Sequence, residues 1–243
     1  MSIFSGHPKG LYVAFFANMG ERFGFYTMMA ILVLFLQTRF ALDENAASLV
    51  FSGFYFAIYI LALIGGYIAD WMQQYRKIIN IGLIIMILGY ILIAIPGLSL
   101  IVVVLGLFII AFGNGLFKGN LQALVGKLYD KPEYEHLRDS AFNVFYMGIN
   151  IGAFFAPSAA IGIRNWYLST KGFGYDGTLP MLCNKFLNGE VTDTGVLQSL
   201  ANKVSLSGIS VSNLNDFAAN YVDAFATGYN CAFAIAAGAM LVS

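Results

Sequence analysis

The sequence predicts an all-α membrane protein with six transmembrane helices. Hydrophobic residues make up 59% of its 243 residues, and the mean hydropathy is +0.74. Charged residues make up only 11%, against about 25% in soluble domains. The apolar residues gather into six segments, most of them near the roughly 20 residues that a helix needs to cross a bilayer. Helices are expected because a spanning helix satisfies its own backbone hydrogen bonds.

The six segments follow one another along the chain. The first is longer than the apolar core of a signal peptide and has no small-residue cleavage site, so we expect it to be a retained span. The third is apolar on all sides, which favours contact with lipid over much of its surface. The segments are Leu11–Leu36, Ala46–Ala69, Ile78–Ile95, Leu98–Leu128, Ala141–Ile163 and Ala226–Val242.

The last segment is short for a span and has no flanking charge. We therefore expect that the sequence is cut off and that further spans follow, the alternative being a natural six-span protein with a short last helix.

Basic residues of the short connections predict the orientation. Lys and Arg gather before the first segment, between the second and third, and between the fourth and fifth, which places the N-terminus in the cytoplasm. The predicted divisions are residues 1–163 with transmembrane helices 1–5, residues 164–223 as an extracytoplasmic insert, and residues 224–243 as transmembrane helix 6. The insert contains two short amphipathic stretches, around residues 196–204 and 214–221, and is expected to be either a partly ordered cap or a flexible loop.

Glu21 and Arg22 lie side by side within the first apolar segment. A charge at membrane depth costs about 3 kcal/mol on insertion scales and usually marks a transport pathway. Neighbouring residues point about 100° apart around a helix, so we expect each charge to find its partner elsewhere, in a cavity. Asn18, Phe25 and Tyr26 share the same broad helix face. The alternative is a buried ion pair that only fixes helix packing.

Lys118 is a second charge within an apolar segment, the fourth. About ten residues, or roughly 15 Å of helix, separate it from the basic connection that follows. Its ammonium group is therefore expected in a polar cavity together with Arg22, rather than extended to the membrane surface. The flanking glycines permit close approach of a neighbouring helix.

Aromatic and amide side chains on other segments add candidates for a binding pocket. Phe51, Tyr55 and Tyr59 lie on one face of the second segment, and Tyr146 and Asn150 on one face of the fifth. Such groups suit a polar, uncharged ligand backbone, and ordinary hydrogen bonding between helices is the alternative.

Asp70 and Arg76 face each other across the short connection between the second and third segments. They predict a cytoplasmic charge latch, with simple solvation as the alternative. No phosphate-binding loop, hydrolase motif or metal-ligand cluster is found in the sequence, so we expect no enzyme activity, no cofactor and no metal site. A net charge of zero gives no attraction to nucleic acid.

Four ordered stretches resemble the signatures of one family. Asn18–Tyr26 (NMGERFGFY) is similar to an E-x-x-E-R-F-x-Y-Y motif, Gly65–Lys77 to a second-span signature, Gly115–Asn120 to a fourth-span lysine motif, and Phe145–Gly152 to F-Y-x-x-I-N-x-G. These are motifs of the proton-dependent oligopeptide transporter (POT/PTR2) family of the major facilitator superfamily. Because its members have two six-helix halves, the resemblance implies an N-terminal half of a major-facilitator-type fold whose C-terminal six-helix half is missing.

The resemblance implies a secondary active transporter that imports di- and tripeptides by alternating access with proton coupling. Its partners would be small peptides, protons, the lipid bilayer and the missing half, and its place the bacterial cytoplasmic (inner) membrane. By resemblance, the peptide would be bound by Arg22, Tyr26, Tyr59, Lys118 and Asn150, and Glu21 would take part in proton coupling.

The sequence departs from the motifs at Asn18, Phe25 and Gly119, where the family usually has Glu, Tyr and Pro. With Asn18, the charges of Glu21, Arg22 and Lys118 sum to +1, which favours anion capture and makes Glu21 a poorer proton acceptor. A transporter of another small anionic solute, a relative without proton coupling, and a non-transporting membrane scaffold subunit are the alternatives.

Overall fold

The structure is a computed structural model, and it describes residues 6–191, 193–208 and 210–242. All regular elements of this part of the chain are helices, and six helical segments are long and apolar enough to cross a membrane. The ends of the predicted divisions, residues 1–5 and 243, lie outside the described residues. The elements are α1 (Lys9–Phe40), α2 (Glu44–Met72), α3 (Tyr75–Ala94), α4 (Leu100–Leu128), the 3₁₀ helix Glu135–Leu137, α5 (Arg138–Thr170), α6 (Leu179–Leu187), α7 (Gly195–Val204) and α8 (Leu214–Leu241).

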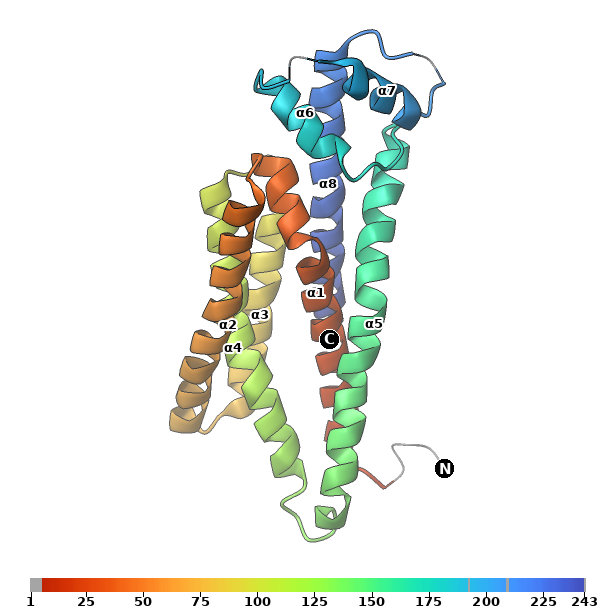
Figure 1. The fold of residues 1–243 in the computed structure, drawn as a ribbon. Helices are drawn as coiled ribbons and strands as arrows, with labels where there is room; N and C mark the ends of the chain where they lie inside the picture. Colours follow the sequence, from red (N-terminus) through yellow and green to blue (C-terminus); the bar gives the residue numbers. More distant parts are fainter. Residues whose placement is uncertain (1–5, 192, 209, 243) are drawn as a thin grey trace.

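The six long helices pack as two groups of three (Figure 1). Helices α2, α3 and α4 form one group and α1, α5 and α8 the other, and contacts of α8 with α3 and of α1 with α2 and α4 join them. The side-chain amide of Asn230 in α8 donates a hydrogen bond to the backbone oxygen of Ile93 in α3 at 2.8 Å. Within the bilayer such a bond satisfies a polar group that lipid leaves unpaired.

A close backbone contact holds α4 against α2. A Cβ atom added at Gly115 would lie 2.5 Å from the backbone oxygen of Leu61, and one added at Gly65 would meet the backbone of Gly115. The side chain of Asn120 donates to the backbone oxygen of Gly65 at 3.2 Å. Because only glycine allows the two backbones to come this close, these residues fix where Lys118 lies relative to α2.

The last long helix differs from the prediction. The sequence predicts a short span that begins at Ala226, whereas α8 begins at Leu214 and has 28 residues. The helix begins before the apolar segment because Asn213 caps it through its side chain, while Asp216 and other polar residues in its first turns lower the local hydropathy. Helix α5 likewise continues to Thr170, beyond the apolar segment. The membrane boundaries and the side on which residues 164–223 lie stay predictions.

The connection between α5 and α8 folds as a small cap at one end of the bundle, with α6 and α7 lying across it (Figure 1). The backbone of Gly174 donates to Val204 at 2.6 Å, and the Tyr221 hydroxyl of α8 bonds the backbone of Asp176. The amphipathic stretch at 196–204 is α7, whereas the stretch at 214–221 belongs to α8. Helix α6 was not predicted; it buries Cys183, and this burial raises the pKa of the thiol to about 12.

Candidate functional site

A hollow of about 390 Å³ lies between α1, α2 and α4. Its volume is within the range of small-molecule pockets, roughly 300–1,000 Å³. Of the residues predicted to bind a substrate, Arg22, Tyr26, Tyr59 and Lys118 all lie on this hollow. The remaining lining residues are Phe25, Met29, Phe51, Tyr55 and Ile58.

Glu21 and Arg22 pair with each other, contrary to the expectation that each finds its partner elsewhere. Arg22 donates from Nε and Nη2 to the two oxygens of the Glu21 carboxylate, and Asn114 Nδ2 donates to Glu21 Oε1 at 2.7 Å. The Cα positions diverge around the helix, but the long flexible side chains turn toward one another. Glu21 is fully buried and does not line the hollow, whereas Arg22 is 4% exposed and does.

The ammonium group of Lys118 carries the charge that the hollow presents to a ligand. Lys118 is half-buried, and it makes no ion pair with any residue that the structure describes. Because Glu21 neutralises Arg22, the three charges leave a net positive charge centred on Lys118. An anionic group entering the hollow would meet an unpaired ammonium next to a guanidinium that is already held in place.

Aromatic rings also line the hollow. The Tyr59 hydroxyl donates to the Tyr55 hydroxyl at 3.2 Å, and the Phe51 ring stacks on Tyr55 with centroids 6.3 Å apart. On α1, the Arg22 guanidinium lies 4.7 Å from the centre of the Phe25 ring. The tyrosine hydroxyls can donate to or accept from a ligand's amide groups, and the rings offer apolar surface to its side chains.

Several predicted residues lie elsewhere. Asn150 is exposed on α5, away from the hollow. The amide of Asn18 donates to the backbone oxygen of Phe145 on α5 at 3.3 Å, so it joins two helices rather than facing the hollow. Asp70 accepts a hydrogen bond from the Tyr75 hydroxyl at 2.5 Å, and within the described residues it forms no ion pair with Arg76. The latch and the role of Asn150 stay predictions.

Two lining residues, Met29 and Ile58, are not predicted from the sequence. Met29 follows Phe25 by four positions and therefore shares its helix face, so the spacing contained a signal for it. Ile58 lies between the tyrosines of α2, where an aliphatic residue is indistinguishable from ordinary packing in the sequence. Only the approach of α1 to α2 shows that it belongs to the hollow.

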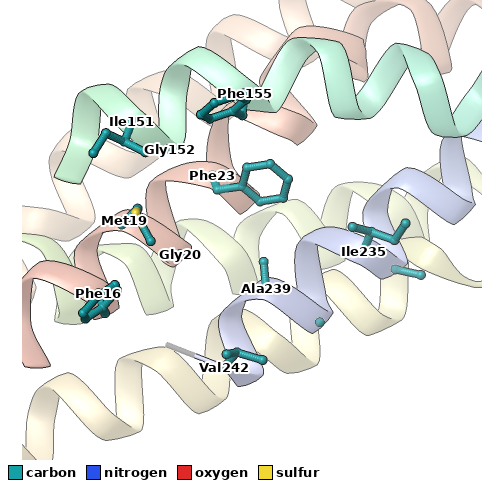
Figure 2. Close-up of a pocket in the computed structure, with 12 residues that line it drawn as sticks. Phe16, Met19, Gly20, Phe23, Ile151, Gly152, Phe155, Ile235, Ala239 and Val242 are labelled. Carbon is teal, nitrogen blue, oxygen red and sulfur yellow. The ribbon is translucent and has the colours of Figure 1, made fainter. Parts of the chain in front are cut away.

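A larger hollow of about 720 Å³ lies between α1, α5 and α8 (Figure 2). Its labelled side chains are apolar and come from all three helices, with Phe16, Phe23 and Phe155 as the largest among them. Without a charged or amide side chain in its lining, this hollow offers nothing to orient a polar ligand. The smaller hollow at Arg22 and Lys118 is therefore the candidate site.

Comparison with known proteins now identifies the family. The sequence profile described as "PTR2: POT family" matches residues 76–243, which is more than half of the chain. The chain belongs to the POT family. This family consists of transporters and not of enzymes, and the protein crosses the membrane several times.

Curated relatives of this POT protein include transporters of known and unknown substrate. The dipeptide and tripeptide permease A of Cronobacter turicensis is 37% identical over 152 residues, which cover 63% of this chain and 30% of the permease. The uncharacterized transporter YclF of Bacillus subtilis is 36% identical over 176 residues, 70% of this chain and 35% of the relative. The chain thus spans about a third of the length of these relatives.

Solved structures agree with the fold. A crystal structure of a peptide transporter POT in complex with sulfate is 32% identical, with a TM-score of 0.57 over 87% of this chain and 41% of the other. A bacterial homologue of human drug peptide transporters is 26% identical, with a TM-score of 0.63 over 96% of this chain and 38% of the other. The six helices correspond to about 40% of such a transporter.

Proposed function

We propose that this chain is the N-terminal half of a secondary active transporter that imports di- and tripeptides by alternating access with proton coupling. The observation that carries the proposal is the hollow that Arg22 and Lys118 line together with Tyr55 and Tyr59. In the proposal, the chain resides in a bacterial cytoplasmic membrane with its N-terminus in the cytoplasm. A C-terminal six-helix half completes the cavity.

The carboxylate of the peptide binds Lys118 in this proposal. The Lys118 ammonium has no ion-pair partner among the described residues and is half-buried beside a neutralised Arg22. It gains more from a carboxylate than an exposed lysine does, because the surrounding low dielectric strengthens the attraction. Arg22 supplies further donors from a guanidinium that Glu21 holds in place. The peptide backbone is bound by the hydroxyl groups of Tyr26 and Tyr59.

The names of relatives support a peptide substrate. The Cronobacter turicensis protein is named for dipeptides and tripeptides, and the sulfate-bound structure is named as a peptide transporter. Glu21 is proposed to take part in proton coupling, with Asn114 as a second donor to its carboxylate. Asp70 and Arg76 are proposed to act as a latch that forms in another conformational state, in which Tyr75 releases the Asp70 carboxylate.

Uptake by the full-length protein in proteoliposomes tests the proposal. A labelled dipeptide should accumulate, and an imposed inward pH gradient should increase its uptake. Lys118→Gln should lower the affinity for the dipeptide by about tenfold or more, because a hydrogen bond to a charged group contributes about 1.5–3 kcal/mol. Lys131→Gln, which removes an exposed cation of the loop before α5, is the matched control and should leave the affinity unchanged.

The alternatives predict other outcomes of the same experiment. Uptake of a different small anion but of no peptide would assign the hollow to another solute, and peptide uptake that ignores the pH gradient would remove proton coupling. A protein that is folded and inserted but moves no solute would be a scaffold subunit. That last result would contradict the proposal entirely.

A further inference from the structure

A second pair of hollows lies at the end of the bundle where α3 begins and α4 ends. The first, which we call the apolar groove, measures about 360 Å³, runs between α1, α3 and α4, and is lined mostly by aliphatic side chains such as Val13, Leu83 and Leu121. The second, which we call the basic mouth, measures about 350 Å³ and is lined by Arg76, Lys77 and Lys127 with Gln73 and Gln74. These residues are distinct from those of the hollow at Lys118.

The groove and the mouth share two lining residues. Arg76 and Leu124 line both of them, so a charged and an apolar side chain lie where the two hollows meet. Asn80 adds an amide to the groove, one helical turn from Arg76. The combined site has an apolar channel between helices at one end and several hydrogen-bond donors at the other.

The positive charge of the mouth is not neutralised by the described residues. Arg76, Lys77 and Lys127 form no ion pair there. Asp70, the carboxylate closest in sequence to Arg76, accepts a hydrogen bond from Tyr75. Asp130, three residues after Lys127, pairs with Arg138 at 3.6 Å. The Lys127 ammonium lies 4.0 Å from the centre of the Tyr75 ring, which holds the cation in place without cancelling its charge.

The start of α3 adds to this positive potential. Its first turn contains two cations and no acidic residue, and the side chain of Gln74 does not cap it. Because the N-terminus of a helix already carries partial positive charge, cations there are unfavourable unless an anion compensates them. The mouth is therefore complementary to a negatively charged group, and no acidic residue is among the described residues that line it.

We propose that this site binds one anionic phospholipid, with its phosphate in the basic mouth and an acyl chain in the apolar groove. A phosphate diester accepts hydrogen bonds from Arg76 and Lys127, and basic pockets between transmembrane helices attract anionic lipid headgroups. The acyl chain gains free energy for each methylene that it buries in the groove. Both parts of the site fit this one occupant, whereas a free phosphate would leave the groove unused. This lipid site does not depend on what the transporter carries.

Native mass spectrometry of the full-length protein, released from nanodiscs of equal phosphatidylglycerol and phosphatidylcholine, tests the site. The protein should retain phosphatidylglycerol over phosphatidylcholine by at least about fivefold, the factor for one cation beside an anionic lipid. Arg76→Gln and Lys127→Gln should each lower that ratio about fivefold. Lys131→Gln, an exposed cation that lines neither hollow, is the matched control and should keep the ratio.

Further variants separate the possible occupants. Leu124→Trp fills the junction and should lower retention of phosphatidylglycerol, while inorganic phosphate and glycerophosphoglycerol, which lack acyl chains, should not be retained by the parent protein. If Leu124→Trp fails to fold in a thermal-melting control, the Arg76→Gln and Lys127→Gln variants test the lipid site without it.

Three results would overturn the proposal. Equal retention of the two lipids by the parent protein would remove any charge selectivity. Retention of inorganic phosphate as strong as that of phosphatidylglycerol would make the mouth a site for a free anion. A dimer that Leu124→Trp abolishes, in the absence of a lipid preference, would assign the groove to a second copy of the chain.

Discussion

Arg22 and Arg164 are 4% and 3% exposed, yet the protein holds these two buried cations in different ways. Arg22 donates twice to the carboxylate of Glu21 and lines a hollow that also contains Lys118. The pair is electrically neutral, so its burial costs less than that of a single charge, and its guanidinium edge remains available to a ligand.

Arg164 has no carboxylate among its described partners. Its guanidinium donates to the side-chain oxygen of Asn165 at 2.9 Å and to the hydroxyl of Tyr229 at 3.2 Å. It also lies 4.2 Å from the centre of the Tyr175 ring and 5.1 Å from that of Phe225. Aromatic rings and polar side chains stabilise the Arg164 cation in place of a carboxylate. These contacts join α5, α8 and the connection to α6.

The comparison shows that a buried charge does not by itself mark a functional site. Both arginines lie on helices long and apolar enough to cross a membrane, but only Arg22 shares a hollow with a second cation that has no ion-pair partner among the described residues. In the sequence, Arg164 follows an apolar segment and is therefore predicted to belong to the connecting insert, residues 164–223. Its aromatic surroundings come from two other parts of the chain, the connection to α6 and α8, and so only the fold reveals them.

The largest loss of stability is expected when the Arg22 guanidinium is removed. Arg22→Ala leaves the fully buried Glu21 carboxylate with Asn114 as its remaining hydrogen-bond donor, and should destabilise the protein by about 3–5 kcal/mol. Denaturant unfolding in detergent measures this. Combining Arg22→Ala with Glu21→Gln should recover a large part of the lost stability, because no buried charge is then left unpaired. If Arg22→Ala alone costs less than about 1 kcal/mol, the Glu21–Arg22 pair is solvated and the prediction is wrong.

Two glycines sharpen the comparison next. Gly115→Ala brings a methyl group to 2.5 Å from the Leu61 backbone and should destabilise by about 1–3 kcal/mol, because neither backbone can move aside easily. Gly228→Ala, beside Arg164, meets its nearest atoms at 3.1 to 3.3 Å and should cost less, since a shift of a few tenths of an ångström suffices. Melting temperatures of the two variants provide the measurement, and the reverse order would contradict the packing described.

A charge-conserving change distinguishes the two arginines by function. Arg164→Lys keeps the positive charge but loses the planar group that stacks on Tyr175 and Phe225, and should destabilise by about 1–2 kcal/mol. It should leave dipeptide affinity unchanged. Arg22→Lys should lower that affinity, because a lysine cannot keep both hydrogen bonds to Glu21 and still face the hollow. If the two variants change dipeptide uptake equally, the assignment of Arg22 to binding and of Arg164 to stability is wrong.

The smallest effect is expected in the cap, and it should depend on pH. Burial alone would raise the pKa of Asp176, but hydrogen bonds from Thr178 and the nearby Lys203 charge outweigh it, and the pKa lies below its ordinary value of 3.8. Ionised Asp176 therefore stabilises the cap above that value, and this contribution is lost as the pH falls through the lower folded-state pKa. Asp176→Ala should cost about 1 kcal/mol near pH 7.

Thermal melting at two pH values measures the contribution of Asp176. The gap in melting temperature between the parent and Asp176→Ala should narrow between pH 7 and pH 3. Lys203→Gln, which removes a cation 4.0 Å from the carboxylate, is a milder control. If the difference in melting temperature between the parent and Asp176→Ala does not change with pH, the side chain of Asp176 contributes by packing and not by its charge.

The sequence by itself determined the family and the number of long helices. Hydropathy sums over a window of neighbours, so segments of about 20 apolar residues are visible without any knowledge of packing. The motifs around Arg22, Lys118 and Asn150 likewise lie in contiguous residues. What hydropathy missed was the beginning of α8, where Asp216 and the cap residue Asn213 are polar yet helical.

Only the tertiary structure decided how the charges are partnered. Glu21 and Arg22 bond each other because their long side chains turn around the helix, a choice that Asn114 of α4 stabilises from 93 positions away. In the same way, Arg76 lines a groove of α1 and α4 rather than pairing with Asp70. The order of residues fixes which groups are close in the chain. The free energy of pairing two charged groups depends instead on the distances between helices. Backbone contacts such as that of Gly115 with Leu61 set those distances.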